Sequence, residues 1–322
     1  MSRVIPSMSA SQTDAIVLRA PGDVGLQTVG LVAPGSEDVV VDVRHSAIST
    51  GTERLLWSGE MPPFPGLSYP LVPGYEAVGT IVEAGDAVSL DVGDTAFVPG
   101  ARCYTDAAGL FGASASRLIA PASRVKRVDA GWVESATLLA LAATAHRAVT
   151  LTDHSPELIV GHGVLGRLAA RIVRAIGHPA PTVWEHSKDR RGGAIGYEVV
   201  SEADDDRHDY RVVCDMSGDN AVLDRLIART AKGGEVVLAG FYAASLSFAF
   251  PPAFMRGTSI RIAAEFTPAD IDAVTSLVAS GALDLEGLIT HRMPATEAAN
   301  AYATAFGDPS CLKMILDWSD AR

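Results

Sequence analysis

The sequence predicts an α/β chain made of two parts, a partly open β-barrel and a doubly wound parallel sheet. From Thr13 to about Pro121, short β-rich runs are broken by Gly and Pro, which is typical of a compact barrel. Residues 157–265 instead alternate short apolar runs with segments of helical periodicity. Strand, helix, strand in this order is typical of a parallel sheet covered on both faces.

The elements of each part can be assigned in chain order. The barrel strands are expected in DAIVLRA, DVVVDVRHSAI, AVGTIVEAG, DTAFVPG and ASRLIAP, followed by an apolar helix in ESATLLALAATAHRAV. The parallel sheet should use ELIVG, PTVWE, YRVVCDMSG, EVVLAGF and IRIAAE as strands, with helices in VLGRLAARIVRAIG and NAVLDRLIARTAKGG. The tail returns to barrel-like signals in LITHRMPATEAANAYATAF and CLKMILDW. We therefore expect a barrel domain over residues 1–145, completed by 288–322, and a sheet domain over 146–287.

One connection in the sheet domain is unusually short. Between YEVV (197–200) and YRVVCDMSG (210–218) only nine residues intervene, and these include the whole acidic run EADDDRHD. Nine residues are too few for a crossover helix between parallel strands. We expect a solvated loop there and one thinner face of the sheet.

Composition excludes several classes of partner. The formal net charge is -12, which disfavours binding to nucleic acid or to an anionic membrane surface. The N-terminal MSRVIPSMSASQ has no apolar core of a leader, and no apolar run approaches the roughly 18 residues of a membrane span. A cytoplasmic protein with a small-molecule substrate is expected. Cys103, Cys214 and Cys311 form no CxxC pair and suggest neither a disulfide framework nor a thiolate cluster.

A glycine-rich loop indicates a dinucleotide site. Gly161, Gly163 and Gly166 form G-x-G-x-x-G directly after an apolar strand and directly before a helix. The first glycine permits a tight turn, the second lets a pyrophosphate approach the backbone, and the third allows close packing of helix on strand. Val164 and Leu165 open the helix, whose free N–H groups face the phosphates.

The residue after the next strand bears on the choice of cofactor. Glu185 ends PTVWE, where a carboxylate can accept hydrogen bonds from both ribose hydroxyls, which favours NAD over NADP. Lys188, Arg190 and Arg191 follow closely and can attract a 2'-phosphate, so NADP stays open as the alternative. The remaining expected cofactor contacts are Ser217 and Gly240, in YRVVCDMSG and EVVLAGF.

The barrel motifs resemble those of a known superfamily. VPGYEAVGTIVEAG resembles the P-G-H-E-x-x-G-x-V-x-x-x-G signature of the zinc-type medium-chain dehydrogenase/reductases, and AISTGTERLL resembles their GICGTD loop. AKGGEVVLAGF, LITHR and LKMIL extend the resemblance over nearly the whole chain. The resemblance implies a GroES-like barrel, completed by the C-terminus, joined to a Rossmann domain.

The resemblance also draws attention to an altered metal site. In the zinc enzymes a Cys and a His from these two motifs bind the metal, but here Thr50 and Tyr75 stand in their places while Glu76 is kept. A catalytic zinc needs about three N, S or carboxylate ligands. The family's structural lobe of four close cysteines is also missing, since only Cys103 lies in that region. We therefore expect no protein-bound zinc.

Without zinc, oxidation of an alcohol needs another proton acceptor or an easier substrate. Thr52 matches the family hydroxyl that bonds the substrate alcohol. Tyr75, Thr50 and Glu76 are candidates to complete a proton relay, with Glu53 beside them. The alternatives are that Glu53 and Glu76 are structural carboxylates paired with a cation, and that Tyr75 only fills the space of the metal.

Longer stretches, among them STGTERLLWSGEMPPFPGLSYPLVPGYE, are similar to the 3-hydroxyethyl bacteriochlorophyllide a dehydrogenase family of phototrophic bacteria. This similarity implies NAD-dependent oxidation of the 3-(1-hydroxyethyl) group of a chlorophyllide-type macrocycle to acetyl, within bacteriochlorophyll biosynthesis. A planar tetrapyrrole needs a wide apolar cleft, for which Trp57 and Phe64 are candidates. Phe254, in FAFPPAFM, offers a second wall or else a homodimer contact.

The propionate of such a pigment would bind a cation, and Arg54, Arg102 or Arg117 can provide one. Two other functions stay open. One is a zinc-free reductase of the same superfamily that acts on an enone or quinone. The other is a catalytically silent pigment-binding carrier, which the intact glycine loop disfavours.

Overall fold

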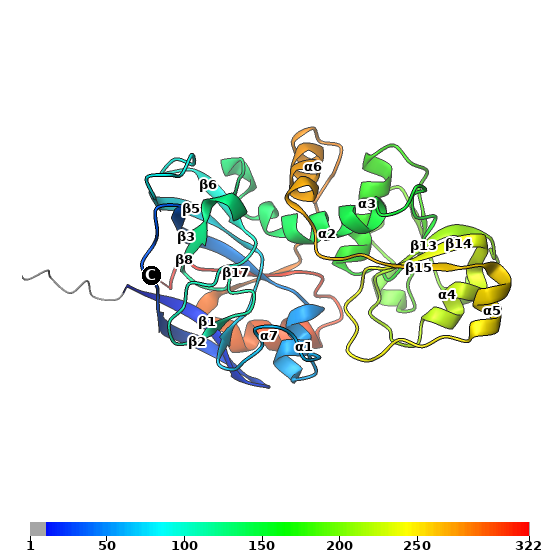
Figure 1. Cartoon of the computed structure of the whole chain (residues 1–322), viewed down its shortest axis with the longest axis horizontal. Helices are drawn as coiled ribbons and strands as arrows, with labels where there is room; N and C mark the ends of the chain where they lie inside the picture. Colours follow the sequence, from blue (N-terminus) through cyan, green and yellow to red (C-terminus); the bar gives the residue numbers. More distant parts are fainter. Residues whose placement is uncertain (1–10, 322) are drawn as a thin grey trace, which may run out of the picture.

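Strands from both ends of the chain build the first of two units in the structure, a computed structural model that describes residues 11–321 (Figure 1). The N-terminal residues 1–10, and with them most of the segment judged to lack a leader, lie outside the described part. One sheet of this unit has the order β2-β1-β4-β7. Its strands are β2 (Asp23–Gly30), β1 (Gln12–Ala20), β4 (Leu71–Val72) and β7 (Ala108–Gly109).

The second sheet of the barrel has the order β16-β17-β3-β5-β6-β9, and β8 also pairs with β3. Its strands are β16 (His291–Pro294), β17 (Met314–Asp317), β3 (Asp38–Ile48), β5 (Ala77–Ala84), β6 (Thr95–Val98), β9 (Lys126–Arg127) and β8 (Arg117–Pro121). Because β17 pairs antiparallel with β3, the C-terminal segment joins the N-terminal sheet.

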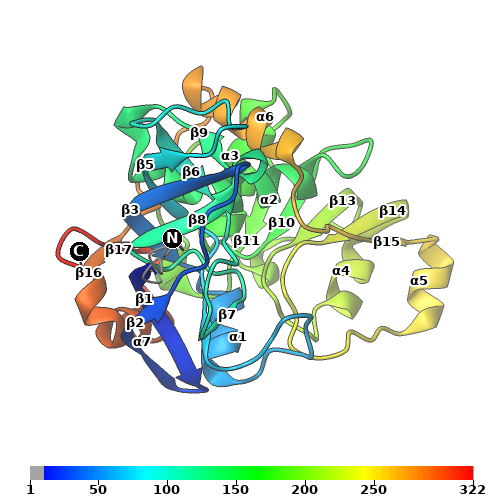
Figure 2. The same ribbon diagram turned by 60° about the vertical axis from the view of Figure 1, so that its left-hand side comes forward.

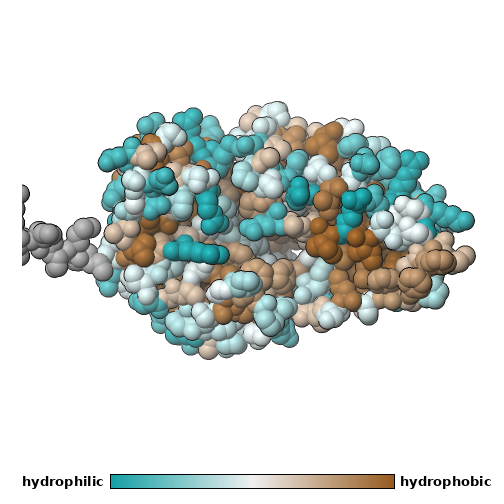
Figure 3. All heavy atoms as spheres, viewed as in Figure 1, coloured by the Kyte–Doolittle hydropathy of each residue, from teal (hydrophilic) through white to brown (hydrophobic). Residues whose placement is uncertain are grey.

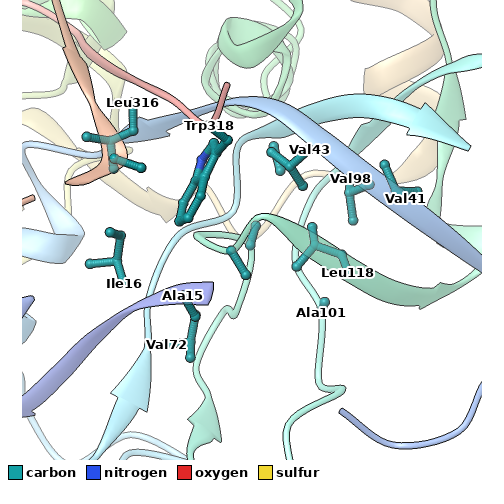
Figure 4. Packing of buried hydrophobic residues seen from close by; sticks show 14 of the residues in the cluster. Ala15, Ile16, Val41, Val43, Val72, Val98, Ala101, Leu118, Leu316 and Trp318 are labelled. Atoms are coloured by element: carbon teal, nitrogen blue, oxygen red, sulfur yellow. The ribbon is translucent and has the colours of Figure 1, made fainter. Parts of the chain in front are cut away.

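The barrel interior is filled by apolar side chains from both sheets (Figure 4). Trp318, just past β17, is fully buried among Ile16, Val43 and Leu316. Its indole Nε1 donates a hydrogen bond to Ser46 Oγ at 2.9 Å, so the one polar atom of the ring is satisfied. This packing fixes the C-terminal strand against β3.

The second unit is a six-stranded sheet in the order β12-β11-β10-β13-β14-β15, and every neighbouring pair is parallel. Figure 2 shows β13, β14 and β15 side by side. The strands are β10 (Leu158–Val160), β11 (Thr182–Trp184), β12 (Glu198–Val200), β13 (Tyr210–Asp215), β14 (Thr230–Leu238) and β15 (Ser259–Ile262). The order reverses beside β10, and ligands of such sheets bind at the carboxyl ends of the strands around that point.

Three helices connect strands of this sheet, α3 (Val164–Ala175), α4 (Leu223–Arg229) and α5 (Phe250–Arg256). The expected gap is confirmed, because β12 and β13 are joined only by the short 3₁₀ turn η5 (Glu202–Asp204) and its flanking loop. The helix predicted over 220–234 is shorter in the structure. It ends at Arg229, and Thr230 already belongs to β14, whose pairing with β13 shifts register before Val212.

Helices between the units complete the fold. α2 (Leu139–Val149) and α6 (Pro268–Ala279) lie between the barrel and the parallel sheet, while α1 (Thr52–Ser58) and α7 (Ala298–Gly307) lie below the barrel in Figure 1. His146 on α2 is joined to Asp270 on α6 by an Nδ1–Oδ1 contact of 2.8 Å. None of the helices within residues 11–321 has the length and apolar character needed to cross a membrane. The three cysteines are free and buried.

Candidate active site and cofactor cleft

The glycine loop has the geometry that a dinucleotide pyrophosphate requires. Gly161, directly after β10, has φ +100°, a conformation that side chains rarely adopt. A Cβ on Gly166 would lie 1.9 Å from the Gly161 carbonyl oxygen, so α3 can pack this closely only without a side chain there. A Cβ on Gly163 would meet no protein atom within 4 Å, so this glycine borders open space at the N-terminus of α3.

Glu185 lies directly against this loop. Its side chain is 5% exposed, its Oε2 accepts a hydrogen bond from the His162 backbone N–H at 3.1 Å, and its Oε1 accepts one from Ser187 N–H at 2.9 Å. The carboxylate is thereby fixed beside the strand end where the ribose of a dinucleotide binds. Both of the backbone donors that hold it would be retained whatever side chains flank them.

A buried histidine, which sequence reasoning passed over, links the loop to the next segment. The two ring nitrogens of His162 contact Arg190 O at 2.7 Å and Tyr197 OH at 2.9 Å. Burial lowers the pKa of His162 to about 4, so the ring is neutral near pH 7. Arg167 on α3 donates to His162 O at 3.0 Å and also bonds Arg190 O. The only sequence signal for this link was the position of His162 within the glycine motif.

The two arginines that follow Glu185 donate hydrogen bonds from their guanidinium groups to backbone carbonyls. Arg190 Nε donates to Pro309 O at 3.1 Å, in the segment that leads to β17. Arg191 Nε donates to Glu185 O at 2.8 Å. Lys188 is exposed. The structure therefore places Arg190, expected at the cofactor, on a contact between the two units.

Ser217 and Gly240 lie together at the carboxyl ends of β13 and β14. Ser217 Oγ donates to the buried Asp215 at 2.7 Å, and Gly240 N–H donates to Asp215 O at 3.1 Å. Tyr242 OH also donates to Asp215, at 2.5 Å. A Cβ on Gly161 would lie 3.2 Å from the Ser217 backbone, so these residues border the glycine loop.

In the barrel, the positions of the family's metal ligands hold a different arrangement. Glu76 is fully buried and forms an ion pair with the Nζ of Lys313, which is also fully buried. Burial raises the pKa of Glu76, and the Lys313 cation partly offsets this. Thr50 and Tyr75 offer only hydroxyl oxygens. Across residues 11–321 no three His, Cys, Asp or Glu side chains gather as metal ligands do, and this donor set does not fit zinc.

Tyr75 instead joins a group of hydroxyls. Its phenol oxygen lies 2.5 Å from Ser49 Oγ, and the side chains of Ser49 and Thr52 both act to lower its pKa. Burial, and then the negative charge of Glu76, raise the pKa of Tyr75 well above its usual value near 10. The phenol therefore stays protonated at any physiological pH. It can hold an alcohol oxygen but is a poor base.

Glu53 lies behind these hydroxyls and is fully buried. Its Oε1 accepts the Ser49 N–H at 3.0 Å, and its Oε2 accepts the hydroxyl of Tyr302, from α7, at 2.6 Å. Burial raises the pKa of Glu53 to about 7, although these hydrogen bonds act in the opposite direction. We name the whole group the polar cluster; it consists of Ser49, Thr52, Glu53, Tyr75, Glu76, Tyr302 and Lys313.

The structure thus brings together four of the five expected catalytic residues. Thr50 precedes α1 and is half-buried, and the structure records no side-chain bond for it to the cluster. Sequence reasoning missed Ser49, Tyr302 and Lys313. Lys313 stood in the LKMIL segment that carried the family resemblance, and Ser49 directly precedes Thr50, whereas Tyr302 gave no signal at all.

Four aromatic side chains lead from the polar cluster to the surface. Ring centroids are separated by 5.3 Å between Tyr75 and Phe111, by 6.3 Å between Phe111 and Phe64, and by 6.4 Å between Phe64 and Phe241. We call these four residues the aromatic row. Phe241 follows β14, so the row passes from the barrel to the parallel-sheet unit. Phe64 and Phe241 remain 40% and 41% exposed, which leaves their faces free for a ligand.

The other expected substrate contacts are placed differently. Trp57 packs against Phe306 with centroids 5.5 Å apart, at the edge of the barrel core. Phe254 is on α5, at the end of the sheet unit remote from the barrel (Figure 1), and pairs with Phe250. Phe254 is therefore not brought to the aromatic row.

The candidate cations for a carboxylate also differ in their surroundings. Arg54, on α1, is exposed, and so is Arg102. Arg117 Nε is bonded to Asp42 at 2.7 Å, which occupies this guanidinium within the barrel.

Known proteins resemble the chain in sequence and in fold. Residues 35–130 match the alcohol dehydrogenase GroES-like domain. A 2-desacetyl-2-hydroxyethyl bacteriochlorophyllide A dehydrogenase from Cereibacter sphaeroides is 54% identical, with 95% of this chain and 98% of that protein covered.

Among solved structures, a zinc-binding dehydrogenase from Sinorhizobium meliloti bound to NADP has a TM-score of 0.79 at 20% identity, covering 95% of this chain and 99% of that one. A protein described as a short chain alcohol dehydrogenase from Escherichia coli CFT073, complexed with NADH, has a TM-score of 0.83 at 17% identity, with the same coverage. At these identities the similarity concerns the fold.

Proposed function

This chain belongs to the family of the 2-desacetyl-2-hydroxyethyl bacteriochlorophyllide A dehydrogenases, within the medium-chain dehydrogenase/reductases, and from this membership we infer its function. We propose that it oxidises the hydroxyethyl side chain of a bacteriochlorophyllide to an acetyl group, as a step of bacteriochlorophyll biosynthesis. Within this proposal, the aromatic row is the single observation that carries the choice of a planar substrate.

The aromatic row suits a planar macrocycle in both position and chemistry. It begins at Tyr75, whose hydroxyl belongs to the polar cluster, and ends at Phe64 and Phe241 on opposite units. A tetrapyrrole lying against Phe64 and Phe241 would place a short side chain toward Tyr75. Burial of an apolar ring face contributes roughly 25 cal/mol per Å² before the costs of association.

We propose NAD as the cofactor, because the carboxylate of Glu185 beside the glycine loop would repel a 2'-phosphate. The two arginines that follow support this choice, since Arg190 and Arg191 are bonded to backbone carbonyls. Gly161, Gly163 and the N-terminus of α3 would hold the pyrophosphate. When bound, NAD supplies a nicotinamide ring that accepts a hydride.

The residues of this chain would orient the alcohol. Tyr75, held by Ser49, and Thr52 present hydroxyls that can hydrogen-bond the carbinol oxygen. An alcohol next to a conjugated ring is easier to oxidise than an isolated one, because the ring stabilises the carbon that loses the hydride. Arg54, exposed on α1, is the proposed partner of the pigment's propionate.

The direct test is an assay of the purified protein with NAD and 3-hydroxyethyl bacteriochlorophyllide. The expected result is NADH in one-to-one ratio with a pigment that has lost two hydrogens, measured by the red absorption band and mass spectrometry. Tight pigment binding without turnover would instead support a carrier. Turnover restricted to enones or quinones would support a reductase of another specificity. The Arg54→Ala variant should raise KM for the carboxylate-bearing pigment more than for its methyl ester.

We also propose that the chain forms a homodimer through β15 and α5. β15 is an edge strand, and exposed apolar side chains gather around it (brown on the right of Figure 3). These side chains are Phe248, Phe250, Phe254, Met255 and Ile262. Ile262→Lys should shift sedimentation toward the monomer, while Val92→Lys, at an equally exposed barrel residue, should not. A wild-type protein that sediments as a monomer would refute this proposal.

A further inference from the structure

We propose that Glu53 is the final proton acceptor of the alcohol oxidation, reached through the hydroxyls of Tyr75 and Ser49 and positioned by Tyr302. The inference rests on the proposed function and adds to it a path for the proton. Such a path is needed because Tyr75 and Thr50 replace the metal-binding residues of the zinc enzymes. A neutral phenol that holds the alcohol oxygen cannot itself keep the proton that the alcohol releases.

Ser49 is the residue that joins the two ends of this path. Its Oγ lies 2.5 Å from the Tyr75 hydroxyl, and its backbone N–H donates to Glu53 Oε1 at 3.0 Å. The carboxylate is therefore adjacent to the residue whose hydroxyl contacts the phenol. In the proposed path, Oγ leaves the phenol and turns toward the Glu53 carboxylate by rotation of the Ser49 side chain about its Cα–Cβ bond.

Unlike Glu76, Glu53 forms no ion pair with any of residues 11–321. Glu76 is ion-paired with Lys313, and both are fully buried. Glu53 has only hydrogen-bond donors, Tyr302 OH and Ser49 N–H. The charge of Lys313 lowers the pKa of Glu53 and that of Glu76 raises it, but burial dominates and brings it to about 7. Near neutral pH the group can therefore both take up and release a proton.

Atoms and electrons balance along this path. The carbinol C–H bond breaks, and its electron pair goes to the oxidised nicotinamide that the proposed function supplies. The hydroxyl proton passes to the Tyr75 oxygen as the phenol proton passes to Ser49 and the Ser49 proton to Glu53. Both hydroxyls end neutral, Glu53 ends protonated, and Tyr302 donates its hydrogen bond to Oε2 throughout.

The first test is the pH dependence of kcat with hydroxyethyl bacteriochlorophyllide. For the wild type, kcat should rise up to a pH of about 7, where Glu53 becomes ionised, and then level off. Glu53→Gln should abolish the rising limb and lower the plateau about 100-fold, with KM for the pigment unchanged. Ser49→Ala should lower kcat similarly, and Ser49→Thr, which keeps a hydroxyl, should restore most of it.

Tyr302→Phe provides a variant that retains the acid and the packing of the ring. Loss of its hydrogen bond removes an effect that lowers the pKa of Glu53, so the rising limb of kcat should move to higher pH. Tyr104→Phe is the matched control. It also removes a phenol bond inside the barrel, to Gly112 O at 2.6 Å, and should leave the limb in place.

Unfolding of the cofactor-free protein gives a readout independent of activity. A carboxyl whose pKa is raised by folding stabilises the folded state least when both states are ionised. The contribution of Glu53 should therefore be fully present below pH 4.5 and decline as the pH rises to about 7. Glu53→Gln should remove this decline. Denaturant titrations of the wild type and of Glu53→Gln between pH 4.5 and about 7 measure this change in the free energy of unfolding.

The outcomes separate the two proposals. A protein that oxidises the pigment at no pH overturns the proposed function. A protein that oxidises it, but whose limb is unmoved in both Glu53→Gln and Tyr302→Phe, overturns the proton path alone. If Glu53→Gln does not fold, the shift of the rising limb of kcat expected for Tyr302→Phe still tests the proton path.

Discussion

The glycine loop and the polar cluster are built on different principles. At the glycine loop, function depends on backbone: a positive φ at Gly161, a close approach at Gly166, and N–H groups that hold Glu185. In the polar cluster, the hydrogen bonds and the ion pair are made mostly by side chains, and two of these, Tyr302 and Lys313, come from a distant part of the chain. Substitution therefore has different consequences in the two places.

A backbone site can be recognised from a short motif, because few sequences produce its geometry. A side-chain cluster can change its chemistry by single replacements while the fold persists. Here Tyr75, where the zinc enzymes have a histidine, is accommodated by Ser49 and Phe111, and Lys313 provides the only cation beside the buried Glu76 among the bonds recorded in residues 11–321. The comparison predicts larger losses of stability at the cluster than at the loop.

The largest effect is expected for Lys313→Met. Removal of the ammonium leaves Glu76 buried without its partner, which costs about 3–5 kcal/mol. Lys126→Met breaks a pair with Asp272 that is exposed, and should cost less than about 1 kcal/mol. Urea titrations of both variants measure the difference, and equal losses would contradict a dominant role for burial.

Tyr75→Phe should lower kcat for the pigment about 100-fold in folded protein, because the ring still packs on Phe111 while the hydroxyl that holds the alcohol is lost. The dissociation constant for NAD should not change. A variant with wild-type kcat would mean that Tyr75 only fills the space that zinc occupies in related enzymes.

At the loop, Gly166→Ala should destabilise the protein by about 1–3 kcal/mol, since the new Cβ would be forced against Gly161 O. Alanine normally stabilises a helix relative to glycine, so a loss of stability in this variant would indicate a steric conflict. Gly307→Ala, in α7, meets no atom within 4 Å and should be neutral or stabilising. Thermal unfolding of the pair distinguishes steric conflict from helix propensity.

The smallest effect is expected for Glu185→Gln. The amide keeps the shape of the side chain but loses the charge that favours ribose hydroxyls over a 2'-phosphate. The ratio of kcat/KM for NAD to that for NADP should fall about tenfold. An unchanged ratio would remove Glu185 as the residue that selects the cofactor.

Much of the fold could be predicted from periodicity. The strand Asp38–Ile48 was predicted with its full bounds, because it is rich in β-branched residues and most of its apolar side chains are buried. β2 (Asp23–Gly30) was missed because most of its side chains are half-buried and show no clear alternation. The helix over 220–234 was extended too far, since Ala231 and Lys232 are good helix formers that pairing with β13 draws into β14.

The site was predictable only in part. The glycine motif and Glu185 are local signals, and the structure places them together. Phe254 was expected as a second wall for the substrate or as a dimer contact because it lies in the apolar run FAFPPAFM, yet its position on α5 depends on tertiary structure that no local pattern encodes. Tyr302 gave no signal because a tyrosine within an Ala-rich helix is usually core, and its contact with Glu53 joins residues 249 apart.

The hydrogen bond from Arg190 to Pro309 has a consequence for motion. It is one of the contacts that span the two units on the side of the glycine loop. A macrocycle that enters between Phe64 and Phe241 requires these units to separate, either by breaking this bond or by rotating about it. An exposed hydrogen bond of this kind contributes about 1 kcal/mol, which is less than a tenfold bias. This bond alone therefore adds little to the free energy needed to separate the units on that side.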